Sequence, residues 1–344
     1  MSAVEDLSRG KGQSGEDGGT RKKGDKLPND KESLRKKKYE EYLQEVKMVA
    51  WEVVGVIAGF IVLNVKAHRH SNSLTSSASS YPLKQKSLAG KLILVTGAGQ
   101  NLGRELSLQL SNLGAILVLW DISEKQNEQT AEMIRASGGE AYPYTCDISN
   151  QEEVAKTASK VRRDVGNPEY LFNNAGTYEH KPFLSHTPGE IRRLVNVNLL
   201  GNLWVTSEFL GYMTKNNKGH IVCISSVLGY IGRNNVVPLP TAAAQVWGMT
   251  EALAEELRAE RRSQVTVTAV HPFLISNVDD VKPNLKFPWL FEILEPADAA
   301  KRIITGVRRN QEEIFLPEKL KPIMIFSKVL PRKLRRLFAD YMES

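Results

Sequence analysis

The stretch KLILVTGAGQNLG, residues 91–103, runs from an apolar segment through a glycine-rich turn into an amphipathic segment. A strand, a turn with little side-chain bulk and a helix together can hold a dinucleotide. Glycines let the backbone approach the pyrophosphate, and the helix N-terminus offers free N–H groups. A glycine-rich turn alone is weak evidence, so its interpretation depends on the downstream part of the chain.

Downstream of this stretch, short apolar runs alternate with amphipathic segments. The apolar runs are 115–122, 140–149, 170–176, 220–226, 265–272 and, as a last candidate strand, 312–317. Strands that alternate with helices favour a parallel sheet covered on both faces. We therefore predict an α/β fold, with one Rossmann-type doubly wound domain over residues 88–318.

An acidic residue, Asp121, ends the second apolar run in AILVLWDI. A carboxylate at this point can accept hydrogen bonds from both ribose hydroxyls, and it would repel a 2′-phosphate. The alternative interpretation is a solvated aspartate at the end of a strand. The pattern predicts NAD(H) as the cofactor, in preference to NADP(H).

The chain before this domain has a different composition. Residues 1–46 are rich in Gly, Lys, Asp and Glu, which predicts disorder. The run 48–65, inside a predicted hydrophobic anchor at 47–66, is 18 residues long and can just cross a hydrocarbon core of about 30 Å. An interfacial helix and a soluble helix are the alternatives. Residues 67–87 form a Ser-rich linker.

Six motifs follow one another along the chain at familiar spacing. They are TGAGQNLG at 96–103, WDI at 120–122, CDIS at 146–149, NNAG at 173–176, VNVN at 195–198 and ISS at 224–226. This series resembles the short-chain dehydrogenase/reductase superfamily, and within it the membrane-anchored retinol and 17-beta-hydroxysteroid dehydrogenases. The resemblance implies a protein of the endoplasmic reticulum or lipid droplets that contacts membrane lipid and a lipophilic small molecule, and it is compatible with a homodimer.

The resemblance also assigns cofactor contacts to matching positions. These are Gly97, Asn101, Leu102, Gly103, Asp121, Asp147, Ile148, Asn174 and Gly176, with Asn173 supporting the neighbouring strand. Asp147 would contact the adenine amino group, with Ile148 beside it. Asn101 stands where the family has its middle glycine; asparagine tolerates left-handed backbone, but its side chain takes up space near the pyrophosphate.

Two catalytic positions of the family match and two do not. Ser226 and Asn198 match the serine and the asparagine, whereas Leu239 and Ala243 occupy the tyrosine and lysine positions. Hydride transfer at a carbonyl needs a group that gives or takes a proton, and such a group contributes about 10²–10⁴ in rate. We therefore predict a homologue whose redox activity is lost or strongly reduced.

Two other functions fit the same residues. One is an active NAD-dependent oxidoreductase on a lipophilic alcohol or ketone, with Tyr230 or His271 as a non-standard proton donor. The other is a lipid-surface scaffold that ignores NAD, which Asn101 favours and which Asp121 and Asp147 oppose.

The remaining features exclude some classes of site. Cys146 and Cys223 lie in apolar runs and are expected to be buried rather than disulfide-bonded. No spacing of His and Cys suggests a metal. The net charge of +7 lies largely near the ends, and without a nucleic-acid motif we expect no nucleic-acid partner. Residues 319–344 are basic and amphipathic, so they either lie on an anionic membrane or cover the substrate cleft of their own domain.

Overall fold

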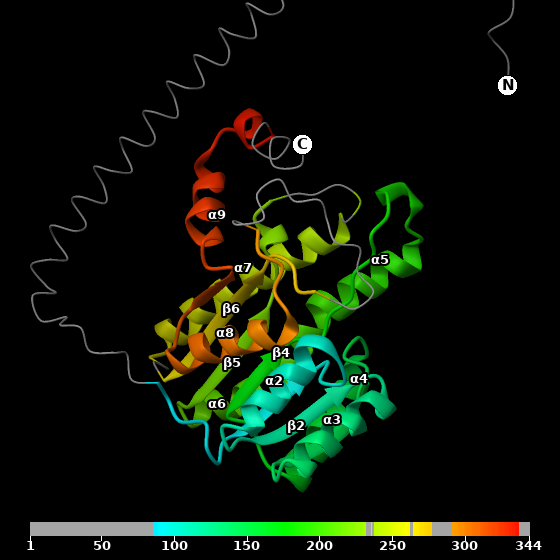
Figure 1. The fold of residues 1–344 in the computed structure, drawn as a ribbon, viewed down its shortest axis with the longest axis vertical. Helices are drawn as coiled ribbons and strands as arrows, with labels where there is room; N and C mark the ends of the chain where they lie inside the picture. Colours follow the sequence, from blue (N-terminus) through cyan, green and yellow to red (C-terminus); the bar gives the residue numbers. More distant parts are fainter. Residues whose placement is uncertain (1–84, 232–234, 236, 262–263, 277–290, 337–344) are drawn as a thin grey trace, which may run out of the picture. The chain divides into compact units, whose positions relative to one another are not determined.

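The computed structural model describes residues 85–231, 235, 237–261, 264–276 and 291–336 (Figure 1). The predicted disordered segment 1–46, the predicted anchor 47–66 and almost all of the predicted linker 67–87 lie outside the described residues. Within the described part of the chain, no helix has the length and apolar character needed to cross a membrane.

Seven strands form one parallel sheet in the order β3-β2-β1-β4-β5-β6-β7. Their bounds are β1 (Leu92–Thr96), β2 (Ile116–Asp121), β3 (Glu140–Thr145), β4 (Tyr170–Asn173), β5 (Gly219–Ile224), β6 (Val265–Pro272) and β7 (Glu313–Leu316). The chain builds outward from β1 to β3, then returns to place β4 on the other side of β1. In doubly wound sheets, ligands bind at the carboxyl ends of the strands next to such a reversal.

Helices cover both faces of the sheet, as Figure 1 shows. One face carries α2 (Asn101–Ser111), α3 (Glu124–Ala136) and α8 (Pro296–Arg308), and the other carries α4 (Gln151–Asp164), α6 (Asn202–Lys215) and α7 (Pro238–Ala259). Two shorter segments, α5 (Pro188–Val195) and the π-helix η2 (Asn196–Gly201), lead into α6. The predicted doubly wound α/β domain is confirmed.

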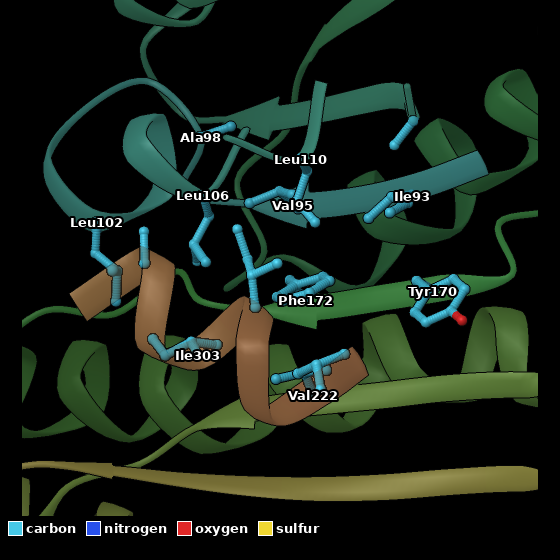
Figure 2. Packing of buried hydrophobic residues seen from close by; sticks show 14 of the residues in the cluster. Ile93, Val95, Ala98, Leu102, Leu106, Leu110, Tyr170, Phe172, Val222 and Ile303 are labelled. Atoms are coloured by element: carbon cyan, nitrogen blue, oxygen red, sulfur yellow. The ribbon is translucent and has the colours of Figure 1, made fainter. Parts of the chain in front are cut away.

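The core follows from the alternation of side chains along each strand. Ile93 and Val95 of β1 point to the face that α2 and α8 cover, whereas Leu94 between them points to the face that α4 and α6 cover. Figure 2 shows the first of these clusters, in which Leu106 of α2 and Ile303 of α8 pack towards the sheet. Burial on both faces explains why the strands read as continuous apolar runs.

The C-terminal segment begins as part of this domain. Helix α9 (Leu320–Val329) follows β7, and its Leu320 and Met324 are buried. They belong to a cluster with Val227 and Phe315, close to the end of β5. The first turns of the predicted basic segment 319–344 therefore pack on the domain itself.

Candidate cofactor and catalytic site

The turn after β1 has a backbone that few side chains would allow. Gly97 has a φ of +66°, and Asn101 has a φ of +45°, in the left-handed region that asparagine tolerates. A Cβ on Gly103 would lie 1.9 Å from the carbonyl oxygen of Gly97. The backbone of Gly103 thus packs directly against that of Gly97. The exposed Asn101 side chain takes no part in this close approach.

Side chains from three elements hold the turn in place. Asn174, just after β4, donates from Nδ2 to the carbonyl oxygens of Thr96 and Gly97 at 2.9 and 3.2 Å. Thr130 of α3 donates to the carbonyl of Ala98 at 3.0 Å, and Arg104 of α2 bonds both Thr130 and the Gly99 carbonyl. Asn174 was expected here from its motif. Arg104, which directly follows the turn motif, and Thr130, which lies 26 residues further on, were not singled out from the sequence.

Asp121 ends β2 next to the same turn. Its Oδ2 accepts the Gly99 N–H and its Oδ1 accepts the Ser123 N–H, both at 2.8 Å. The residue is only 8% exposed. Two backbone donors fix the carboxylate in one orientation, at the point where the resemblance places the adenine ribose.

The N-terminus of α2 fits a bound pyrophosphate. It has no side-chain cap and no acidic residue in its first turn, so its first N–H groups are available to an anion. The Leu102 side chain packs into the core, which leaves only its backbone for the cofactor. Gly97, Asn101, Leu102, Gly103 and Asp121 would hold a nicotinamide dinucleotide, which when bound supplies or accepts a hydride.

The remaining expected cofactor residues lie at the ends of β3 and β4. Oδ1 of Asp147 accepts the Ser149 N–H at 2.9 Å, and Ile148 is buried against Gly201 at the end of η2. Gly176 lies close to Asn198, since a Cβ on it would be 3.2 Å from Oδ1 of that residue. These residues follow β3 and β4 at the carboxyl edge of the sheet, where β2 and β1 lie between the two strands.

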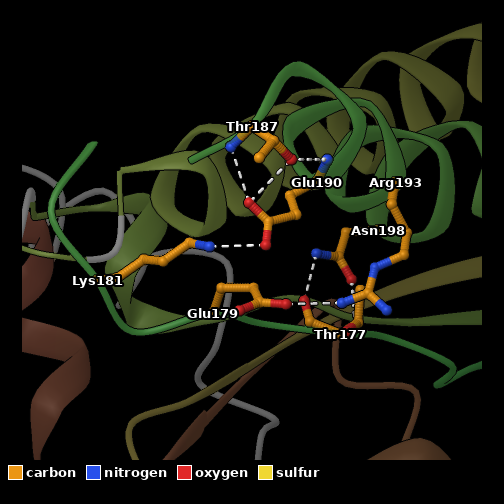
Figure 3. A network of polar contacts seen from close by, with 7 residues as sticks. All are labelled: Thr177, Glu179, Lys181, Thr187, Glu190, Arg193 and Asn198. Carbon is orange, nitrogen blue, oxygen red and sulfur yellow. Dashed lines mark hydrogen bonds and ion pairs between the residues drawn. The ribbon is translucent and has the colours of Figure 1, made fainter. Parts of the chain in front are cut away.

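Asn198 lies in the π-helix η2 and is bonded at both ends. Its side-chain Oδ1 accepts the Thr177 N–H at 2.8 Å and its Nδ2 donates to the Thr177 carbonyl at 2.7 Å (Figure 3). Its own carbonyl oxygen accepts Nδ2 of Asn202 at 2.7 Å. Asn198 therefore clamps the loop after β4, and Asn202, which the sequence did not single out, binds the carbonyl of Asn198.

Ser226 lies directly after β5 and caps the short helix η3 (Val227–Gly229). Its Oγ accepts the Leu228 N–H at 3.1 Å and donates to the Pro272 carbonyl at 3.3 Å. The neighbouring Ser225 donates to the carbonyl of Ala243 at 2.9 Å, which docks α7 against the end of β5. Leu239 is in the first turn of α7, and Ala243 is buried one turn later.

The two alternative proton donors, Tyr230 and His271, are both buried. The Tyr230 hydroxyl is 3.2 Å from Oε1 of Glu313, and burial together with this carboxylate raises the pKa of Tyr230 well above its ordinary value. His271 is fully buried on β6, and burial lowers its pKa to about 4. Tyr230 and His271 pack edge to face with ring centroids 5.1 Å apart. Both side chains serve the packing between η3, β6 and β7.

Comparison with known proteins identifies the family of this chain. The family model for short chain dehydrogenase matches residues 91–284. The chain belongs to the short-chain dehydrogenase family. This short-chain dehydrogenase is 36% identical over 259 residues to epidermal retinol dehydrogenase 2 of Mus musculus, which covers 75% of this chain and 84% of the relative. It is 32% identical to 17-beta-hydroxysteroid dehydrogenase 13 of Homo sapiens, over 73% of this chain and 83% of the relative.

Solved structures of the family share the fold. A metagenomic short-chain oxidoreductase in complex with NADP is 28% identical, with a TM-score of 0.57 over 67% of this chain and 98% of the other. A short-chain dehydrogenase/reductase from Burkholderia phymatum in complex with NAD has a TM-score of 0.62 at 21% identity, over 71% and 94% of the two chains. These neighbours bind NAD or NADP, so the likeness alone does not decide between the two.

Proposed function

We propose that this short-chain dehydrogenase binds NAD(H) and a lipophilic ligand at a membrane, with redox activity lost or strongly reduced. One observation carries the proposal: Leu239 and Ala243 occupy the first turns of α7, where the family's tyrosine and lysine are expected. Neither side chain can donate or accept a proton. Between Ser226 and Gly248 the sequence offers one tyrosine, Tyr230, and no lysine.

The preference for NAD(H) is supported by Asp121. Its carboxylate is held by two backbone N–H groups beside the glycine turn. A 2′-phosphate on the ribose would meet this fixed negative charge, whereas ribose hydroxyls could donate to it. The uncapped N-terminus of α2 supports binding of the pyrophosphate.

The ligand class and the location are supported by the relatives and by the N-terminal sequence. The relatives are named for retinol and for 17-beta-hydroxysteroids, which are lipophilic alcohols. The apolar run 48–65 is long enough to anchor the chain to a bilayer, for which we propose the endoplasmic reticulum or lipid droplets. Deleting residues 1–70 should release the protein from the membrane fraction of cells; a truncated protein that stays wholly membrane-bound would refute this segment as the sole anchor.

Cofactor titration followed by a redox assay tests the central part of the proposal. Calorimetry should show that the full chain binds NADH more tightly than NADPH. The same preparation should then convert retinoids and hydroxysteroids at rates orders of magnitude below those of epidermal retinol dehydrogenase 2. If neither cofactor binds, the scaffold without NAD replaces this proposal.

A further inference from the structure

The segment between β4 and α5 carries an apolar tip. The tip is Phe183 and Leu184 on the short 3-10 helix η1 (Phe183–Ser185), none of whose residues is buried. Leu184 is 96% exposed and Phe183 is 50% exposed. Single exposed apolar residues are common, but two large ones side by side at the end of a loop indicate contact with another apolar phase.

A polar frame fixes the tip in this exposed position. Lys181, just before the tip, lies 2.7 Å from Oε1 of Glu190, and Thr187 and Glu190 form a capping box at the start of α5 (Figure 3). Glu179 pairs with Arg193 at 2.7 Å. The hydrogen bond from Lys181, followed by those from Thr187, lowers the pKa of Glu190 to about 2, so Glu190 stays ionised throughout the physiological range.

The ion pairs of the polar frame also reduce the repulsion between its carboxylates and a negatively charged membrane surface. Both of its carboxylates, Glu179 and Glu190, are neutralised by a basic partner. Arg192, exposed in the last turn of α5, adds a positive charge on the helix that follows the tip. The apolar tip therefore projects from surroundings that an anionic surface would attract.

The same edge of the sheet carries the most basic segment that the structure describes. Because all seven strands are parallel, the loop after β4 and the helix α9 after β7 both start from the carboxyl edge (Figure 1). Residues 319–336 contain seven Lys or Arg and no Asp or Glu. Ile325, in the same segment, is 41% exposed. Exposed apolar side chains among basic ones are the composition of surfaces that bind anionic lipid.

We propose that the carboxyl edge of the domain docks on an anionic bilayer, with Phe183 and Leu184 inserted among the lipid headgroups. This inference rests on the membrane association proposed above and adds a contact in the folded domain to the predicted anchor. The carboxyl edge is also where doubly wound sheets bind ligands. Docked in this way, the carboxyl edge faces the bilayer, and a lipophilic ligand reaches that edge without crossing water.

A single dye at the tip tests this docking in the full-length chain. Both native cysteines are buried, and burial raises the pKa of each thiol to about 12, so a cysteine introduced at an exposed position is labelled selectively. Ser185→Cys places the dye beside the tip and keeps both apolar residues. Met133→Cys is the matched control, because Met133 is 46% exposed near the end of α3, where that helix has returned towards the amino edge.

Each labelled chain is reconstituted into vesicles of phosphatidylcholine and phosphatidylserine, isolated by flotation and exposed to two quenchers. A spin-labelled lipid with its quencher about 5–10 Å deep should quench the dye at position 185, and aqueous iodide should not reach it. The dye at position 133 should show the reverse. Replacing Phe183 and Leu184 with serine in the Ser185→Cys chain should lower the quenching by lipid at least about threefold.

Three results would overturn the docking. The dye at position 185 could be as open to iodide as the dye at position 133, or the full-length chain could fail to float with the vesicles. Alternatively, the dye could be shielded from iodide without quenching by lipid, which would mean that a second copy or another protein covers the tip. Flotation with an iodide-accessible dye rejects the docking alone and leaves the proposed anchor and the redox proposal standing.

Discussion

The turn after β1 and the first turns of α7 lie at the same edge of one sheet, but they differ in how much of the family's chemistry they keep. Around the turn, Gly97, Gly103 and Asp121 stand in the expected positions, and Asn101 adopts the left-handed backbone that a glycine would adopt. In α7 the helix is intact, yet Leu239 and Ala243 carry no proton-transferring group. The chain thus keeps the glycine turn and the acidic residue expected of a dinucleotide site and lacks the tyrosine and lysine expected for proton transfer.

Restoring the tyrosine at position 239 and the lysine at position 243 should have the largest effect, which we expect on the rate of carbonyl reduction. The change Leu239→Tyr with Ala243→Lys is expected to raise the rate of carbonyl reduction by about 10²–10⁴, the usual contribution of a positioned acid or base. Pro238 and Pro240 are accommodated in the first turn of α7, so they do not prevent the helix from starting before position 239. The measurement is NADH-dependent reduction of a retinoid and a steroid ketone.

The matched control for this variant is Leu239→Phe with Ala243→Met, which adds comparable bulk and no proton donor. It should stay at the level of the unmodified chain. Equal gains in both double variants would show that side-chain bulk, rather than proton transfer, limits the reaction.

Overpacking the glycine turn after β1 should weaken the NADH binding that we expect of this turn. Gly103→Ala would bring a Cβ to 1.9 Å from the Gly97 carbonyl, and such overpacking is expected to cost about 1–3 kcal/mol or lower NADH affinity about tenfold to 100-fold. Gly211→Ala in α6 is the control, because, apart from the chain neighbours of Gly211 and the backbone of its own helix, no atom lies within 4 Å of its added Cβ. That control should keep NADH affinity and unfold at the same or a higher temperature; a Gly103→Ala chain that does the same would contradict the tight turn.

Removing the Asp121 carboxylate should have a smaller and more selective effect. Asp121→Ala is expected to weaken NADH binding about tenfold, the scale of a lost charge-assisted hydrogen bond, and NADPH binding less. The ratio of the two affinities is the readout, since the loss of the bonds to Gly99 and Ser123 affects both cofactors alike. An unchanged ratio in calorimetry would remove the argument for NAD(H).

The smallest expected effect is on the pH dependence of stability, and it concerns His271 on β6, one of the two alternative proton donors. Burial lowers its folded-state pKa to about 4, below the ordinary value of 6.5, so it stays neutral in the folded chain while the unfolded chain takes up the proton. Stability is therefore fully present above pH 6.5 and falls as the pH drops towards 4.

Replacing the histidine with leucine should make this slope shallower by about one proton, measured as thermal unfolding across that range. His220, whose pKa burial lowers to about 3, keeps its own contribution in both chains and serves as an internal reference. A slope that the substitution leaves unchanged would mean that His271 is open to protons, and it would return this residue to the search for a donor.

The sequence predicted the elements that depend on local pattern. Apolar runs separated by amphipathic segments predicted the parallel sheet, and Asp121 was placed at a strand end from its position in AILVLWDI. Helix α3 begins at Glu124 because the side chain of Ser123 caps it. Such caps shift a boundary without changing the fold.

Contacts between distant residues could not be predicted in this way. Arg104 and Thr130 meet at the glycine turn only because α2 and α3 pack side by side on one face. Tyr230 finds Glu313 across 83 positions of sequence, which requires the register of β5, β6 and β7. These contacts decide that Tyr230 has a structural partner, whereas the sequence alone left it as a candidate donor.

A single-turnover experiment tests most directly whether binding and redox chemistry are separated in this chain. The unmodified full-length protein, saturated with NADH, is mixed with an excess of retinal or of a steroid ketone, and the absorbance of the bound cofactor is followed. We expect that NADH binds and then stays reduced, with a rate at least about 10²-fold below that of epidermal retinol dehydrogenase 2 under the same conditions. Oxidation of the bound NADH at the rate of that relative would contradict this separation and show that the chain holds a proton donor other than residues 239 and 243.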